Sequence, residues 1–102
     1  MENSCSREAA NWWAKKIKEA SLTSVQNIDA FKEKLSEVIF REFSKNPHLR
    51  ISTYGHPSNL LSEIAFKTEM TAIIPAGYEM QISYGTGVVI YNNNGELIQA
   101  FS

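Results

Sequence analysis

Apolar residues in the first half of the chain recur every three or four positions, which is the spacing of one face of a helix. The first stripe consists of Ala9, Trp13, Ile17 and Ala20. It predicts a helix over residues 6–20. A second stripe of the same period predicts a helix over residues 28–45. Asn46 and Pro47 end that helix, because proline disfavours helical geometry in the residue before it.

From Pro47 onward the spacing changes to short runs, several of them alternating between apolar and polar residues, with Gly, Pro and Asn between them. These runs predict a strand over residues 48–54, a short helix over 58–66, and strands over 69–74, 78–84, 88–91 and 96–101. The segment from Asn92 to Gly95 is a strong hairpin signal. Because connections this short can join only antiparallel neighbours, the strands are expected to form a meander.

Together these elements predict one α+β domain over residues 1–102. Two N-terminal helices and one short helix would pack on an antiparallel sheet of four to five strands, in the order α-α-β-α-β-β-β-β. A length of 102 residues and a hydrophobic fraction of 43% are typical of a single globular domain with its own core.

Charge and cysteine content narrow the functional classes. The net charge of −1 argues against a dedicated nucleic-acid-binding protein. Residues 1–50 carry nine Lys and Arg against seven Asp and Glu, whereas the remainder carries one Lys against four Glu. This asymmetry is usual for two solvated faces, although it can also steer a charged partner. Cys5 is the only cysteine, so no disulfide can form within the chain, and the N-terminus shows no secretory signal pattern. No apolar stretch approaches the roughly 18–20 residues of a membrane span. We therefore expect a cytoplasmic protein that binds no membrane.

Residues that carry chemistry are scarce, and no catalytic or metal-binding constellation is evident. A zinc site needs three or four closely spaced ligands, but Cys5 is far from both histidines, and His48 and His56 fall near opposite ends of one predicted strand. No pattern places a base beside Cys5, and Gly85-Thr86-Gly87 lacks the lysine and the following helix of a phosphate-binding loop. We therefore expect neither an enzyme, nor a cofactor, nor a bound metal.

Aromatic residues are the most informative candidates for binding. Trp12 is adjacent to Trp13 and lies at the edge of the first apolar stripe, so it either packs on the rim of the core or anchors an interface. Tyrosines fall at the ends of predicted strands, where they either only pack or contribute to a site. The candidate binding residues, for a protein or a ligand, are Trp12, Arg50, Tyr54, His56, Tyr84 and Tyr91.

Four segments also carry a family resemblance. They are EAANWWAKKI at positions 8–17, FKTEM at positions 66–70, Tyr84-Gly85 and Ile90-Tyr91. They resemble small proteins of phages and mobile elements of Gram-positive bacteria, in which a helix with paired tryptophans precedes a Phe-rich second helix. The resemblance implies an anti-defence role, anti-CRISPR proteins included, and it supplies no catalytic residues.

Two hypotheses of function follow. The first is a non-enzymatic, anti-CRISPR-like inhibitor that acts in the bacterial host cytoplasm by binding an immune effector protein or ribonucleoprotein. The alternative is an oligomeric sponge that sequesters a cyclic-nucleotide-type immune signal, with Arg50 and His48 near Tyr54 as the ligand-binding groups. A homo-oligomer and a small nucleotide ligand belong to this alternative. A small nuclease ranks third, because the chain has no acidic cluster to hold its metal.

Overall fold

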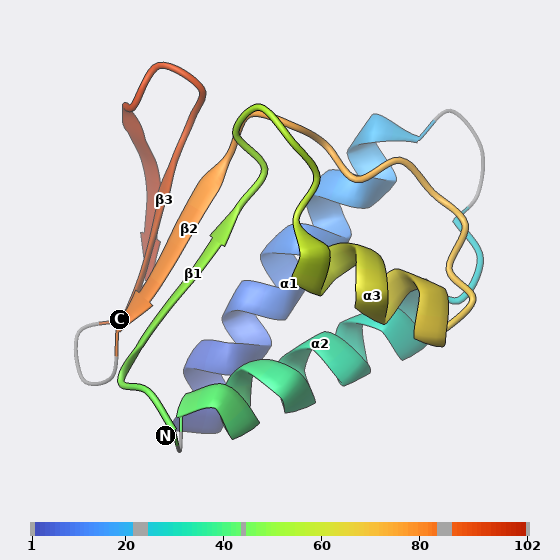
Figure 1. The fold of residues 1–102 in the computed structure, drawn as a ribbon, viewed down its shortest axis with the longest axis horizontal. Helices are drawn as coiled ribbons and strands as arrows, with labels where there is room; N and C mark the ends of the chain where they lie inside the picture. Colours follow the sequence, from blue (N-terminus) through green and yellow to red (C-terminus); the bar gives the residue numbers. More distant parts are fainter. Residues whose placement is uncertain (1, 22–24, 44, 84–86, 102) are drawn as a thin grey trace.

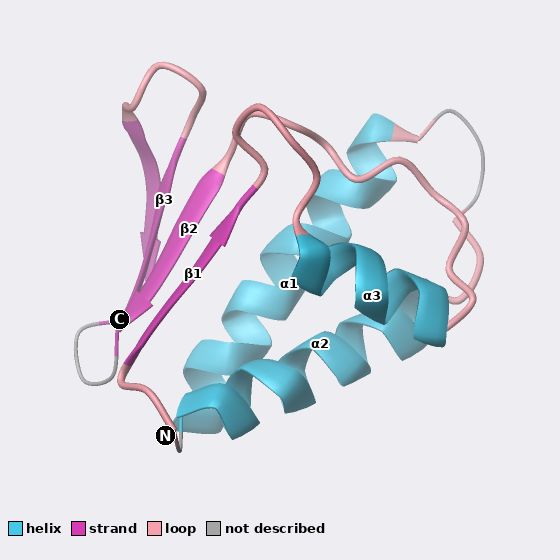
Figure 2. Ribbon diagram, in the orientation of Figure 1, coloured by secondary structure: helices cyan, strands magenta, loops and turns pink. Residues whose placement is uncertain are grey.

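A computed structural model describes residues 2–21, 25–43, 45–83 and 87–101. The elements follow the order α1, α2, β1, α3, β2, β3 and β4 (Figure 1). They form two layers, with the three helices on one face of a four-stranded sheet (Figure 2). The α+β class predicted from the sequence is thus confirmed.

The two long helices run in opposite directions and pack along their length (Figure 1). Helix α1 spans Glu2–Ala20 and begins four residues earlier than predicted, and α2 spans Ile28–Phe43 and ends two residues earlier. Their fully buried side chains are the ones that the apolar periodicity selects, among them Trp13 and Ile17 on α1 and Phe31, Leu35 and Ile39 on α2.

Helix α3 spans Asn59–Lys67 and has a clear signal at each end. Its N-cap is Ser58, whose Oγ accepts a hydrogen bond from the Leu61 N–H at 3.2 Å. At the other end Glu69 has a φ of 56°, its N–H donates to the Phe66 carbonyl, and the Met70 N–H donates to the Ala65 carbonyl. This pair of bonds is the Schellman motif, which normally has glycine at the left-handed position.

The strand predicted over residues 69–74 is wrong. Glu69 and Met70 complete the end of α3, and none of residues 69–74 belongs to a strand. The physical reason lies in the backbone, because a residue with φ near +60° and an N–H already bonded to the helix cannot enter a ladder. The sheet therefore has four strands, the lower of the two predicted numbers.

The sheet is a meander in the order β1-β2-β3-β4, with every neighbouring pair antiparallel. Its strands span His48–Ser52, Glu79–Ser83, Gly87–Tyr91 and Leu97–Phe101. The hairpin predicted at Asn92 to Gly95 is confirmed, since it joins β3 to β4 and is closed by a bond from the Asn92 N–H to the Glu96 carbonyl. Strand β2 is shorter than the predicted range 78–84, of which Tyr84 lies outside the described residues.

The core lies between the helices and one face of the sheet. The register sets Leu49 opposite Ile82, and Ile51 opposite Met80, which in turn faces Ile90. These side chains point to the helices, and all but Leu49 are buried. No helix of the described residues covers the opposite face (Figure 2). None of the described helices is both long and apolar enough to cross a bilayer.

Candidate binding surface on the outer sheet face

The sheet face that carries no helix, here called the outer face, is the surface on which most of the candidate residues meet. Side chains of paired residues in a sheet share a face, so the register defines rows across it. One row runs Arg50, Gln81, Val89 and Ala100 from β1 to β4. The next row runs Ser52, Glu79, Tyr91 and Leu97. Both rows change from polar side chains at β1 and β2 to mostly apolar ones at β3 and β4.

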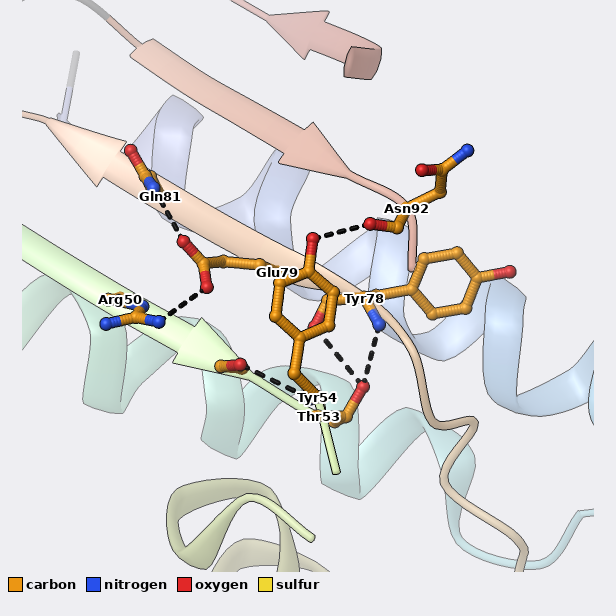
Figure 3. A network of polar contacts seen from close by, with 8 residues as sticks. Arg50, Thr53, Tyr54, Tyr78, Glu79, Gln81 and Asn92 are labelled. Carbon is orange, nitrogen blue, oxygen red and sulfur yellow. Dashed lines mark hydrogen bonds and ion pairs between the residues drawn. The ribbon is translucent and has the colours of Figure 1, made fainter. Parts of the chain in front are cut away.

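The polar half of the outer face is held by an ion pair (Figure 3). The Arg50 guanidinium donates to Glu79 Oε1 at 2.7 Å, and the Gln81 amide donates to Glu79 Oε2 at 2.6 Å. Both carboxylate oxygens are thus occupied, and Glu79 is only 8% exposed. Burial raises the pKa of Glu79, but the hydrogen bonds from Gln81 and Arg50 and the charge of Arg50 bring its net pKa below the ordinary value.

Tyr54, just after β1, is bonded to the segment that follows β3. Its hydroxyl donates to the Asn92 carbonyl, so the side chain crosses the start of β2 from the β1 side (Figure 3). The preceding residue, Thr53, points the other way and is buried, with bonds from its N–H to the Tyr78 carbonyl and from the Tyr78 N–H to its Oγ1. These contacts hold Tyr54 in place while leaving its ring half-buried.

The apolar half of the outer face lies over β3 and β4. Val89 and Tyr91 are half-buried, and Leu97 is 57% exposed. Ala100 lies beside Val89 and is exposed as well. An apolar strip at one side of the outer face therefore borders an ordered Arg-Glu-Gln network, and protein interfaces combine surfaces of both kinds.

Trp12 packs in the core, which is the position that the core-packing alternative expects. Its ring is 6% exposed and meets Trp13 and Tyr78 edge-on, at centroid distances of 5.0 and 5.2 Å. The Lys16 ammonium lies 5.6 Å from the Trp12 ring and 5.8 Å from the Tyr78 ring. Tyr78 and the Lys16 ammonium thus cover the edge of the Trp12 ring that α1 alone would leave exposed.

His56 does not join the other candidates. It lines a separate hollow of about 320 Å³ together with Thr53, Pro57, Ile74 and Ala76, and its own Nδ1 lies 3.3 Å from the Pro57 carbonyl. Tyr54 is not part of that hollow. Tyr84 lies outside the described residues. Of the six candidates, the outer face therefore brings together Arg50, Tyr54 and Tyr91.

The groups of the sponge alternative only partly converge. His48 and Arg50 share a shallow hollow of about 240 Å³ at the β1 end of the outer face, and His48 Nδ1 is 3.0 Å from Ser83 Oγ. No Phe, Tyr or Trp ring is among the described residues lining this hollow, and Arg50 is already bonded to Glu79. A nucleotide phosphate would have to compete with that carboxylate for the guanidinium.

The helical layer offers hollows of a different kind. Two lie along α1 and α2, with volumes of about 510 and 620 Å³, and share Asn11 and Lys32. Their charged lining residues are Arg7, Lys15, Lys18, Glu19, Asp29, Lys32, Glu33 and Glu37. Cations and anions are equal in number there, so the groove has no net attraction for phosphate. Among the described residues no group of three or more His, Cys, Asp or Glu side chains could hold a metal ion.

Sequence reasoning missed several members of the outer face, namely Glu79, Gln81, Val89, Leu97 and Ala100. The alternation of residues 78–84 separates Glu79 and Gln81 from the core-facing side chains. The alternation does not predict that Glu79 and Gln81 meet Arg50, because that contact depends on the β1–β2 register.

Comparisons with protein-family models, curated proteins and solved structures find no match to this chain.

Proposed function

We propose that this protein is a non-enzymatic binding protein and that its outer sheet face is the surface that contacts the partner. The observation that supports this is the uncovered face itself, on which an apolar strip adjoins a satisfied polar network. A face of this kind gains free energy from burial while its polar rim keeps its hydrogen bonds. Tyrosine and arginine, both present here, are enriched among residues that dominate binding energy.

The partner that fits this face is a protein with an apolar patch beside a hydrogen-bonding rim. Arg50 is 66% exposed at its side chain although it is bonded to Glu79, so it retains donors for a partner carboxylate or carbonyl. Tyr91 is the central aromatic side chain of the strip, flanked by Glu79 on β2 and Leu97 on β4. With a net charge of −1, affinity would come from these contacts more than from long-range attraction.

The specific form of the proposal is an anti-defence role, in which the protein inhibits a bacterial immune effector such as a CRISPR nuclease. Its support is the resemblance of residues 8–17 and 66–70 to small phage and mobile-element proteins. A protein without chemistry of its own can inhibit by occupying a docking surface, and a rigid sheet face suits that task.

The experiment is a plating assay in bacteria that express this protein together with a defined CRISPR effector targeting a phage. The proposal expects wild-type protein to restore plaque formation against at least one effector of a panel. Val89→Lys would abolish the effect, because it places a charge in the centre of the apolar strip while leaving the helix-facing core unchanged.

The matched control is Lys18→Glu, which changes the charge of an exposed residue on the helical layer. We expect it to inhibit as well as wild type. If Val89→Lys and wild type restored plating equally, the outer face would not be the binding surface. If wild type failed against the whole panel while remaining folded, the anti-CRISPR form of the proposal would be overturned.

A further inference from the structure

The tip of the β3–β4 hairpin carries a chemically reactive dipeptide, Asn94-Gly95. Of the asparagines in the chain, only Asn94 is followed by glycine. The side-chain carbonyl carbon of an asparagine can be attacked by the backbone nitrogen of the next residue, and glycine at that position hinders the attack least because it has no Cβ. Asn94 and Gly95 are both exposed, so water reaches both residues.

The folded turn holds the attacking nitrogen away from its target. The Gly95 N–H donates to the Asn92 carbonyl at 3.0 Å, which makes Asn94 the second central residue of a β-turn. The Asn92 Oδ1 also accepts bonds from the Asn94 N–H at 2.9 Å and from the Glu96 N–H at 3.0 Å. To bring Asn94 Cγ to the Gly95 nitrogen, the chain must rotate about the Cα–C bond of Asn94, and this rotation breaks the bond from Gly95 to Asn92. The reaction therefore requires the turn to open locally.

The surroundings of Gly95 leave room for that opening. Its φ is 78°, and among the described residues no atom beyond its chain neighbours lies within 4 Å of where a Cβ would stand. Asn92, by contrast, is anchored, because its carbonyl also accepts the Tyr54 hydroxyl and its side-chain amide donates to Glu96 Oε1 at 2.9 Å. The hydrogen bonds that restrain the dipeptide therefore converge on Asn92.

We propose that Asn94 is a site of spontaneous deamidation and that Asn92 sets its rate by keeping the turn closed. The Gly95 nitrogen forms a bond to Asn94 Cγ and loses its proton to solvent, while the Cγ–Nδ2 bond breaks and Nδ2 takes up a proton and leaves as ammonia. The resulting succinimide adds water at either of its carbonyl carbons, which gives aspartate or isoaspartate at position 94. The overall change consumes water, releases ammonium and leaves a carboxylate on the hairpin.

The isoaspartate form would alter the sheet as well as its charge. Isoaspartate routes the backbone through the former side chain and lengthens it by a methylene, which displaces the Gly95 N–H from the Asn92 carbonyl. The same turn joins β3 to β4, and Tyr91 and Leu97 pair at its base. Amide hydrogen exchange in β4 should therefore be faster in the isoaspartate form than in the unmodified protein. Deamidation does not depend on the proposed function, and either can fail alone.

The test follows deamidation at each asparagine by peptide mass spectrometry while the full chain is incubated in mildly alkaline buffer. One sample is kept folded and another is unfolded in urea. We expect Asn94 to react before every other asparagine in urea, and to react about tenfold more slowly in the folded protein, where the turn bonds are present. This comparison needs no substitution.

Variants at Asn92 test its part in the restraint. Asn92→Ala removes the side-chain bonds to the Asn94 and Glu96 N–H groups, so Asn94 in the folded variant should react about fivefold faster than in wild type. Asn92→Asp keeps an oxygen acceptor at the same place and should restore the slow rate. The matched control, Asn93→Ala, changes the neighbouring turn residue without removing these bonds and should react like wild type. Circular dichroism verifies that each variant is folded.

Three results would overturn the proposal. One is the reaction of another asparagine before Asn94 in urea, and a second is an equal rate at Asn94 in folded and unfolded wild type. The third is an equal rate in wild type and folded Asn92→Ala, because the Asn92 side chain would then not hold the turn closed. If Asn92→Asp reacted as fast as Asn92→Ala, the role assigned to the Asn92 Oδ1 acceptor would be wrong.

Discussion

At the scale of single residues, Glu79 is a carboxylate buried on the sheet face that carries no helix. It stays ionised because Arg50 and Gln81 occupy both of its oxygens, and each donor lies on the same face through the β1–β2 pairing and the alternation of β2. Burying a carboxylate costs free energy unless it is paired and hydrogen-bonded, so the local structure requires these two contacts. Because the pKa of Glu79 is lowered in the folded state, the stability that these contacts contribute depends on pH.

We predict that Arg50→Ala lowers the free energy of unfolding by about 1 kcal/mol at pH 7, a value reduced because the Arg50 side chain is 66% exposed. A carboxylate whose folded-state pKa is depressed contributes stability above its unfolded pKa and loses it as the pH falls through the folded value. The difference between variant and wild type should therefore shrink as the pH falls below the ordinary value of 4.5. Urea titrations at about pH 7 and about pH 3 measure it.

The control for this change is Lys67→Ala, which removes an exposed partner of Glu63 at 3.7 Å. It should change stability by less than about 0.5 kcal/mol at either pH. An Arg50→Ala loss of the same size at both pH values would mean that the arginine acts through packing of its stem and not through Glu79.

At the scale of elements, the end of α3 shows how one backbone angle redirects a segment. Glu69 occupies the left-handed position of a Schellman motif, and its carbonyl accepts a bond from the Asn27 amide at 3.1 Å, which ties this turn to the start of α2. Met70, the next residue, is buried. The turn thus ends the helix, fixes two loops against each other and prevents a strand over residues 69–74.

We predict that Glu69→Gly stabilises the protein by about 1 kcal/mol, because glycine adopts positive φ without the steric cost that a side chain incurs. The bond from Asn27 goes to the backbone and is retained. Urea titration would detect the change. The matched variant Glu63→Gly, in the middle of the same helix, should instead lose about 1 kcal/mol. A destabilised Glu69→Gly would show that the Glu69 side chain contributes more than its backbone strain costs.

At the scale of the whole molecule, positive and negative charges nearly balance. The net charge is −1, and the charges lining the helical groove balance. Many of the lysines are paired within their own helix, such as Lys34 with Glu37 at 3.0 Å. The hollows along α1 and α2 therefore do not offer the uncompensated row of cations that phosphate binding requires.

We predict that fluorescence anisotropy will detect no binding of duplex DNA or RNA at about 50 mM salt and micromolar protein. As a positive control, the triple variant Glu19→Lys, Asp29→Lys and Glu33→Lys would make the helical groove basic and should acquire binding that weakens steeply as salt rises. Binding by wild type with a strong salt dependence would contradict the proposal of a protein partner.

Local patterns in the sequence determined the elements and their class. Two apolar stripes of helical period placed α1 and α2, alternation placed β2, and the turn from Asn92 to Gly95 placed the last hairpin. These features depend on contacts between residues a few positions apart, which periodicity and turn residues record directly. The one strand predicted in error lay where Glu69 takes a conformation usually reserved for glycine.

Tertiary structure alone decided which side chains meet and which are covered. Tyr78 and Lys16 cover Trp12, and the strand register brings Arg50, Glu79 and Gln81 together from positions about thirty residues apart. The helical layer ends before β4 and leaves an apolar edge open. A shift of one residue in the β1–β2 register would separate Arg50 from Glu79 and Gln81, and register is set by long-range packing that no local pattern contains.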